Sequence, residues 1–327
     1  MYPLLSLALA SFLCVPIARR DDPLPAPAGP LVVQTVDSLT LKDTARKKDL
    51  LCKVYFPQTG GPYPVILFSH GFGGNQEAFG TVSRHWASRG YVVIHPSHGD
   101  LAGRRRASGK EAPLLQGSPG GLLGGLYDPQ KIENRVADLV LILDSLGTLP
   151  QPVPELAGKI DPKRIGVAGH SFGAYTAMLI GGVTGDLGRE KARSLADPRG
   201  RCILPISAQG TGQQGLTEKS WDALRIPMMT ITGTRDQGVG GQGVEWKKEP
   251  FRYSPEGDKY LVVIEGANHA SFGGGLGARG SATVEIVKMS STWFWDAYLR
   301  GSEEARRYLQ SDQMTRNAGS RFTFQWK

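Results

Sequence analysis

A pentapeptide near the middle of the chain, Gly169-His170-Ser171-Phe172-Gly173, has the G-x-S-x-G pattern that presents a serine as a nucleophile. Residues 164–168 before it are mostly apolar with β character, and residues 174–180 after it are typical of a helix packed on a sheet. A serine between a strand and a helix must lie on a strained turn, and flanking glycines leave room for that turn. The alternative is a chance match in a chain with 43 glycines. The flanking elements favour a nucleophile elbow.

A serine hydroxyl needs a positioned base that removes its proton. In proteins with this elbow on an α/β sheet, the partners follow in the chain order serine, acid, histidine. Only His269 follows Ser171, because the other five histidines precede it: His70, His85, His95, His98 and His170. His269 also comes just after an expected strand over residues 260–265, in a loop that can deliver its imidazole to the serine. We therefore predict that His269 is the general base.

The acid is expected between these two residues and at the end of a strand. Residues 228–232 are predicted to form a strand, and Asp236 lies in the turn that leaves it. The other acidic residues of this region lie in helical or loop stretches away from strand ends. An Asp in a glycine-rich turn is often only a turn former, and that alternative stays open. The prediction is that Asp236 orients His269 and stabilises its protonated form.

Two backbone N–H groups are expected to stabilise the oxyanion of the reaction. One belongs to Phe172, the residue after the nucleophile. The other is expected in the loop His70-Gly71-Phe72-Gly73-Gly74, with Phe72 as the donor. The small residues of this loop, Gly71 among them, let the backbone approach a substrate, so Gly71 is a candidate pocket residue.

Four further histidines lie near these motifs. We expect His70 to support its loop through hydrogen bonds, and the side chain of His170 to point away from the Ser171 hydroxyl. His95 and His98 have a spacing that could suit a metal, but no carboxylate or cysteine cluster accompanies them. No metal is predicted, and His98 is interpreted as a candidate contact to the substrate.

Two glycine-rich stretches imitate nucleotide-binding motifs. Residues 103–110 resemble a phosphate loop, but the spacing is one residue too long and Glu111 stands where Ser or Thr belongs. Residues 238–243 fit G-x-G-x-x-G without opening a helix directly from a strand. The chain is therefore predicted to need no cofactor.

The order of elements predicts the fold class. Strands alternate with helices, which indicates an α/β domain with a mostly parallel sheet of about eight strands and helices on both faces. The expected strands are 32–37 and 50–56 as an antiparallel pair, then 63–69, 91–95, 164–168, 202–207, 227–232 and 260–265; the expected helices are 77–89, 131–146, 174–180 and 282–299.

The ends of the chain differ from its middle. Residues 1–20 contain an apolar run that resembles a secretory signal, although no basic residue precedes the run and Pro16 disturbs the cleavage pattern. Residues 21–30 read as a Pro-rich linker, 31–300 as the catalytic domain and 301–327 as a charged tail that begins as a helix. Residues 97–130 form an insertion loop without periodicity, of the kind that is often functional. We expect export to the periplasm or the exterior.

The composition, with 40% hydrophobic and 21% charged residues over 327 positions, is that of an ordinary globular protein. A net charge of +8 raises the question of nucleic-acid binding, but the one dense basic cluster, residues 104–106, has no interleaved aromatic residues. We predict no nucleic-acid partner and no stable membrane insertion, and the oligomeric state stays open. Cys52 and Cys202 are expected to be buried and unpaired, although a disulfide between them stays possible.

Four segments together resemble the dienelactone hydrolase-like branch of the α/β-hydrolases, which includes esterases similar to platelet-activating-factor acetylhydrolases and to polyester hydrolases. They read Y-P-V-I-L-F-S-H-G-F-G-G at 63–74, H-W-A-S-R-G-Y-V-V-I-H-P at 85–96, G-H-S-F-G-A at 169–174 and N-H-A-S-F at 268–272. The resemblance covers roughly residues 30–300 and implies a serine esterase with the triad and oxyanion donors named above.

The chain departs from this branch in two ways. Acetylhydrolases of the group carry their acid after the preceding strand, whereas residues 203–215 here contain no acidic residue. This favours a polyesterase or general carboxylesterase over a phospholipid substrate. Dienelactone hydrolases use a cysteine nucleophile, and this chain has Ser171.

The leading hypothesis is a serine hydrolase that cleaves small or polymeric carboxylic esters through an acyl-enzyme. A lipase, polyesterase or acetylhydrolase would use the same chemistry on larger lipid or polymer esters. A non-catalytic binding protein on a hydrolase scaffold is the alternative from another class, and it usually lacks a triad member, whereas here none is missing.

Overall fold

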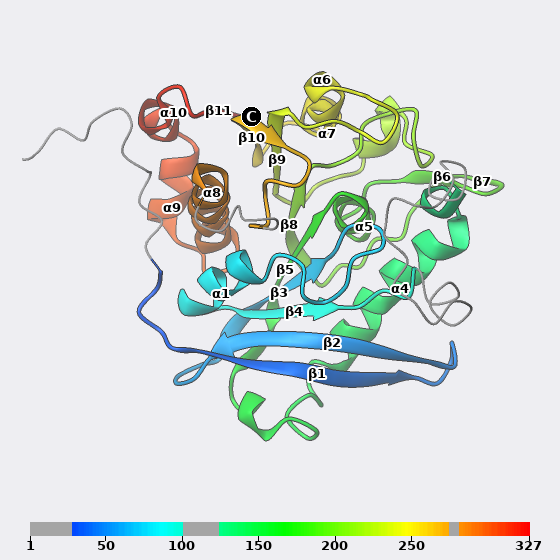
Figure 1. Cartoon of the computed structure of the whole chain (residues 1–327), viewed down its shortest axis with the longest axis vertical. Helices are drawn as coiled ribbons and strands as arrows, with labels where there is room; N and C mark the ends of the chain where they lie inside the picture. The colour runs from blue at the N-terminus through cyan, green and yellow to red at the C-terminus, as the bar shows by residue number, and fades with distance from the viewer. Residues whose placement is uncertain (1–27, 101–123, 275–280) are drawn as a thin grey trace, which may run out of the picture.

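A computed structural model describes residues 28–100, 124–274 and 281–327 of the chain. A nine-stranded sheet runs through the molecule in the order β1-β2-β4-β3-β5-β8-β9-β10-β11, with helices on both of its faces (Figure 1). The six central strands β4, β3, β5, β8, β9 and β10 are parallel to one another, while β1 and β2 at one edge and β11 at the other are joined antiparallel. This is the α/β architecture expected from the sequence.

The strands are β1 (Val33–Asp43), β2 (Lys48–Pro57), β3 (Tyr63–Ser69), β4 (Val92–Pro96), β5 (Ile160–His170), β6 (Gly185–Leu187), β7 (Glu190–Arg193), β8 (Gly200–Ile206), β9 (Met228–Arg235), β10 (Lys259–Asn268) and β11 (Phe322–Trp326). The helices are α1 (Gly80–Ser88), α4 (Pro129–Ser145), α5 (Phe172–Ile180), α6 (Val244–Lys247), α7 (Glu249–Tyr253), α8 (Ala282–Tyr298), α9 (Glu303–Leu309) and α10 (Gln313–Ala318), with short 3₁₀ turns η1 (Pro154–Leu156) and η2 (Glu218–Trp221).

The continuous apolar runs of the central strands supply two separate cores. Successive side chains of a strand point to opposite faces. In β3, Val65 and Leu67 therefore pack in one core with α4 and α5, while Ile66 and Phe68 pack in the other with α1 and α8. Because both faces are covered, the central strands need apolar residues at every position.

Most predicted elements are present with shifted ends. The first helix begins at Gly80 instead of residue 77, and the opening strands are longer than expected. The sequence did not predict the short helices α6 and α7, and it missed two further features. The tail returns to the sheet as β11, which pairs with β10, and β6 and β7 form a small hairpin after α5.

Several predictions concern the ends and the insertion. Residues 1–27, with the proposed signal and most of the linker, and residues 101–123 of the insertion loop lie outside the described residues, so the predictions made for them stay predictions. Residue 129 already belongs to α4, so the last two residues of the predicted insertion are helical. Across the described ranges, we find no helix with the length and apolar character needed to cross a bilayer.

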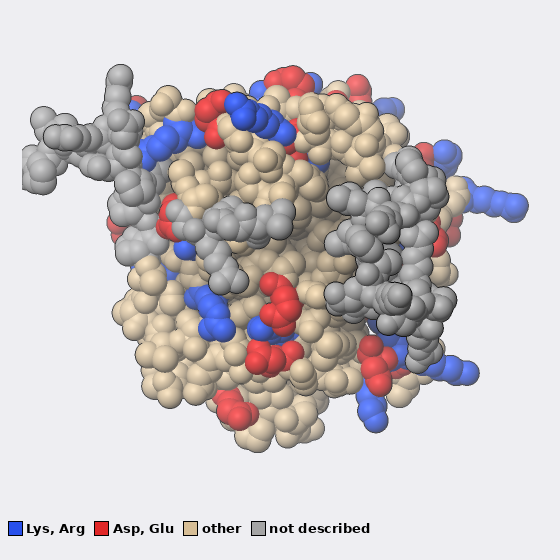
Figure 2. Space-filling model, viewed as in Figure 1, with Lys and Arg blue, Asp and Glu red and all other residues tan. Residues whose placement is uncertain are grey.

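Two further observations concern the charged side chains at the surface and the state of the two cysteines. On the face shown in Figure 2, the described basic and acidic side chains are interspersed. Cys52 and Cys202 are both buried and free, as expected.

Candidate functional site

The serine of the pentapeptide lies on a sharp turn between β5 and α5. Ser171 has φ 55° and ψ −120°, a backbone conformation that non-glycine residues rarely adopt. An added Cβ at Gly169 would lie 2.1 Å from the Gly173 carbonyl oxygen, and one at Gly173 would lie 1.9 Å from the Ser69 carbonyl oxygen. Glycine at both positions lets the turn pack against β3.

The structure brings Ser171, His269 and Asp236 together from three separate strand ends. His269 follows β10, and its Nε2 lies 3.0 Å from the Ser171 Oγ. Its Nδ1 lies 3.0 Å from Oδ1 of Asp236, which follows β9. The carboxyl ends of neighbouring parallel strands meet at one edge of the sheet, which explains how residues about a hundred positions apart come within hydrogen-bonding distance.

Asp236 is fully buried and held as a carboxylate. Its oxygens accept hydrogen bonds from the hydroxyls of Ser207, at 3.0 Å, and Thr232, at 2.9 Å. Burial opposes ionisation, but the hydrogen bond from His269, the nearby Lys247 charge and the Ser207 hydroxyl together lower the pKa of Asp236 below its usual value. A buried carboxylate in this setting can orient an imidazole and stabilise its protonated form.

Ser207 and Lys247 were not identified from the sequence. Ser207 follows β8 with φ 53°, and its Oγ lies 2.9 Å from His269 Nδ1. The buried Lys247 of α6 donates hydrogen bonds to the carbonyl and the hydroxyl of Ser207, at 3.1 and 3.0 Å. Burial lowers the pKa of Lys247 to about 8. A lone lysine in a short polar helix gives no periodic signal, so the sequence could not reveal this cluster.

The other histidines have structural surroundings. His170 Nε2 donates to the backbone carbonyl of His269 at 2.9 Å, so this side chain supports the His269 loop and is directed away from the Ser171 hydroxyl. Burial, followed by the proximity of His269, lowers the pKa of His170 to about 3, which keeps the ring neutral. His70 is hydrogen-bonded within its own loop, as expected.

The interpretation of His98 as a substrate contact needs correction. Its ring is buried between the Ser69 hydroxyl, 2.9 Å from Nε2, and the Asp138 carboxylate, 2.9 Å from Nδ1. Both ring nitrogens are engaged beneath the 70–74 loop. His98 therefore acts within the protein interior, away from the cavities described below.

The expected oxyanion loop lies beside the nucleophile. An added Cβ at Gly71 would lie 3.6 Å from the Ser171 Cβ, so this glycine adjoins the serine. The rings of Phe72 and Phe172 contact each other edge to face with centroids 5.7 Å apart. The two residues proposed as backbone donors are thus neighbours across the site.

Two cavities share His269 as a wall. The first, of about 20 Å³, is lined by Ser171 and by residues of the segments after β8 and β9, together with Leu126 and Tyr127. The second is larger, about 490 Å³, and is lined mainly by residues 77–81 with Lys53, Tyr55 and Arg84. No group of three or more metal-ligating side chains gathers in the part of the chain that the structure describes.

Comparisons with known proteins find two similarities. A family model described as chlorophyllase matches residues 29–111, a region that includes the 70–74 loop and ends before Ser171. The chain is 25% identical over 237 residues to a platelet-activating factor acetylhydrolase from Canis lupus familiaris, covering 66% of this chain and 49% of that protein. The corresponding protein of Cavia porcellus is 24% identical over 235 residues, with the same coverage. The chain thus spans about half the length of the curated relatives it matches.

Proposed function

We propose that this chain, which has the α/β-hydrolase fold, is a serine hydrolase that cleaves carboxylic esters through an acyl-enzyme intermediate. The observation that carries the proposal is the hydrogen-bonded series Ser171 Oγ, His269 Nε2, His269 Nδ1 and Asp236 Oδ1, with both contacts at 3.0 Å. In the proposal Ser171 is the nucleophile, His269 the general base and Asp236 the orienting acid.

In the first half of the reaction, His269 Nε2 takes the hydroxyl proton as Ser171 Oγ bonds to the ester carbon. The carbonyl oxygen becomes negative and is stabilised by the N–H groups of Phe72 and Phe172. His269 then gives the proton to the departing alkoxide, which leaves as the alcohol and an acyl-serine remains.

In the second half, His269 removes a proton from a water molecule, whose oxygen attacks the acyl carbon. The same N–H groups stabilise the second oxyanion, and the proton returns to Ser171 as the carboxylic acid leaves. No cofactor enters either half of this proposed reaction.

The two cavities support a short acyl group and a larger alcohol. The cavity that Ser171 lines has a volume of about 20 Å³, little more than the space of one water molecule, which suits a group such as acetyl. The cavity of about 490 Å³ also borders His269, and we assign the alcohol group to it because His269 is the proposed donor of the proton to the leaving group. We therefore favour esters with a short acyl group such as acetyl over the long acyl chains that a lipase cleaves, and the similarity to acetylhydrolases supports the short acyl group.

The test is hydrolysis of p-nitrophenyl acetate, butyrate and octanoate by the wild type and by Ser171→Ala. We expect the rate to fall with acyl length, and the serine variant to lose activity and labelling by a fluorophosphonate probe. Equal rates for the two proteins would contradict the proposal. A wild type that neither hydrolyses nor becomes labelled would favour a binding protein on this scaffold.

We also propose that the catalytic unit comprises residues 31–300 together with the tail, whose strand β11 completes the sheet, and that residues 1–20 direct export. Expression of the full chain followed by N-terminal sequencing of the exported protein tests the second point. Recovery of the intact N-terminus inside the cell would contradict it.

A further inference from the structure

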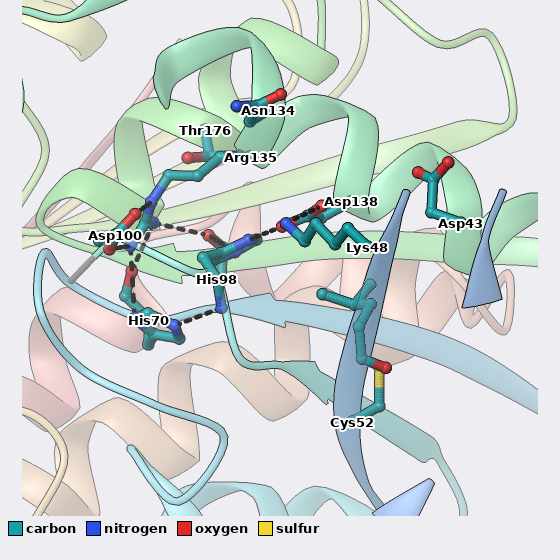
Figure 3. Close-up of polar contacts among 12 residues, drawn as sticks. Asp43, Lys48, Cys52, His70, His98, Asp100, Asn134, Arg135, Asp138 and Thr176 are labelled. Atoms are coloured by element: carbon teal, nitrogen blue, oxygen red, sulfur yellow. Dashed lines mark hydrogen bonds and ion pairs between the residues drawn. The ribbon is translucent and has the colours of Figure 1, made fainter. Parts of the chain in front are cut away.

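A buried arginine lies beneath the loop that carries the proposed oxyanion donor. Arg135 belongs to α4 and is 1% exposed. Its Nε and Nη2 donate to the two carboxylate oxygens of Asp100, at 3.0 and 2.6 Å, and both side chains of this ion pair are almost completely buried (Figure 3). Asp100 Oδ2 in turn accepts from the backbone N–H of Gly73 at 3.3 Å.

The same guanidinium donates to the backbone of the 70–74 loop. Nη1 lies 2.7 Å from the His70 carbonyl oxygen, and Nη2 lies 3.2 Å from the Gly71 carbonyl oxygen. The Gly71 carbonyl belongs to the peptide group that contains the Phe72 N–H. Arg135 therefore holds the opposite end of the peptide that we propose as an oxyanion donor.

His70 makes a second contact to that carbonyl. Its Nε2 accepts a hydrogen bond from the His98 N–H at 3.0 Å, so in the neutral ring the proton is on Nδ1, which donates to the Gly71 oxygen at 2.6 Å. Burial, followed by the charge of Arg135, keeps the pKa of His70 well below its usual value, which maintains this neutral form. With the Gly74 N–H, which donates to the same oxygen at 3.1 Å, three donors thus converge on one carbonyl oxygen.

Arg135 also contacts the other proposed donor residue. Its guanidinium carbon lies 4.5 Å above the ring of Phe172, in a cation–π arrangement. One side chain thereby touches the residue after the nucleophile and the peptide before Phe72. A planar guanidinium can make all of these contacts at once, whereas a lysine ammonium cannot.

We propose that Arg135 is a positioning residue for the oxyanion site. It fixes the Gly71–Phe72 peptide and withdraws electron density through the Gly71 carbonyl, so that the Phe72 N–H binds the developing oxyanion more strongly. Hydrogen bonds in series polarise one another, which is the physical basis of the second effect. The inference rests on the proposed esterase function and assigns to that site a residue without direct contact with the substrate.

The charges around Arg135 are arranged to hold it in place. The Asp100 carboxylate compensates its charge directly. The Nη1 of Arg135 also donates a hydrogen bond to the Ser69 hydroxyl at 3.2 Å. From there, hydrogen bonds continue through His98 to Asp138, which is paired with Lys48 at 2.7 Å (Figure 3). A buried charge with every neighbour satisfied gives a rigid support for the loop.

Two variants test the inference. Arg135→Lys keeps the positive charge and loses the planar guanidinium with its several N–H donors. The double variant Arg135→Gln with Asp100→Asn removes both charges and leaves no uncompensated carboxylate. We expect kcat for p-nitrophenyl acetate, per site titrated with a fluorophosphonate, to fall roughly 10- to 100-fold in the double variant and less in Arg135→Lys, with KM changed less than about twofold.

A second readout distinguishes positioning from general damage. A trifluoromethyl ketone forms an oxyanion on the serine, so its inhibition constant should rise by the same factor as kcat/KM falls. The matched control is Arg46→Gln at the outer end of the network, where Arg46 pairs with Asp138 and does not contact the 70–74 loop. This control should keep its kcat per site.

The outcomes separate the two hypotheses. An unchanged kcat per titrated site in the double variant, or a loss explained wholly by fewer titratable sites, would overturn the role of Arg135. If the double variant does not fold, the comparison of Arg135→Lys with Arg46→Gln decides in the same way. A wild type without esterase activity or labelling would instead contradict the proposed function itself.

Discussion

The ammonium of Lys247 lies 4.0 Å from the Asp236 Oδ1, and both side chains are almost completely buried. The carboxylate oxygen that faces the His269 Nδ1 therefore also has a cationic neighbour. Ser207 lies between them, since its hydroxyl contacts Lys247, Asp236 and His269 at 2.9 to 3.0 Å. Lys247 also lines the smaller cavity beside Ser171. A buried charge at this place affects both stability and the pH dependence of the proposed reaction.

Replacing Lys247 with Met should stabilise the fold at neutral pH. The pKa of Lys247 is lowered to about 8 by burial, so below pH 8 the folded protein carries the full cost of a buried charge. Between pH 8 and about 10.5 the folded state loses this proton while the unfolded state keeps it, and wild-type stability recovers. We expect Lys247→Met to gain about 1–3 kcal/mol at pH 7 and to lose that advantage by about pH 10.5.

Urea denaturation at pH 7 and pH 10.5 measures this difference. Lys248→Met is the matched control, because Lys248 is partly exposed and paired with Glu245 at 2.6 Å. Its effect should stay within about 0.5 kcal/mol at both pH values. A destabilised Lys247→Met at pH 7 would show that the hydrogen bonds of Lys247 outweigh its desolvation.

The same variant should move the pH profile of activity. The Lys247 cation lies beside Asp236 and opposes the positive charge that develops on the imidazole in the transition state, and burial lets Lys247 lose its own charge as the pH rises through about 8. We expect kcat/KM of the wild type for p-nitrophenyl acetate to rise by up to about tenfold as the pH passes about 8, and Lys247→Met to lack this rise. A profile that coincides with that of Lys248→Met would rule out this electrostatic contribution.

Asp236→Asn tests the choice of acid. An amide at this position cannot stabilise the imidazolium and favours the wrong ring tautomer, so kcat should fall by about 10⁴-fold with the fold retained. Asp222→Asn, an exposed aspartate of the same region, is the control and should keep wild-type activity. If Asp236→Asn retained more than about a tenth of the wild-type kcat, another group would have to orient His269.

The two cysteines of the described residues should be inert in the folded protein. Burial raises the pKa of both Cys52 and Cys202, so neither supplies a reactive thiolate. In a Cys14→Ser variant, which removes the third cysteine, we expect no reaction with Ellman's reagent in buffer. In denaturant without reductant, two thiols per chain should react, and none would react if the two cysteines formed a disulfide.

Chain order predicted the candidate site because the chemistry restricts the order of its residues so strongly. With one histidine after Ser171 and one acid at a strand end, elimination selected His269 and Asp236, and the structure places His269 beside the serine and Asp236 beside His269. The parallel strands followed from their apolar runs. The strand β11 was missed because its pairing with β10 joins segments about 60 residues apart, although Phe322 and Phe324 alternate inward as a half-buried strand requires.

The polar network around Arg135 has a weaker sequence signal, which helical periodicity alone could have indicated. The helical period that placed Ile132, Val136 and Leu139 on the buried face of α4 also places Arg135 there. A charged residue on an apolar helix face must find buried partners. Those partners, Asp100 and the 70–74 loop, are distant in sequence, so periodicity could have indicated the anomaly without identifying its purpose.

Gly173→Ala should disrupt the fold, because the new methyl group would lie 1.9 Å from the Ser69 carbonyl oxygen and 2.7 Å from that of His70. Both atoms are backbone at the end of β3, next to the 70–74 loop, so relief requires α5 to separate from the sheet. We expect a loss of more than about 4 kcal/mol, seen as little soluble protein or a strongly lowered Tm. Gly147→Ala is the control, since no heavy atom lies within 4 Å of its added Cβ, and it should be neutral or slightly stabilising. A Gly173→Ala protein with wild-type Tm and activity would mean that the elbow is looser than this packing requires, and the strained geometry of Ser171 would then need another explanation.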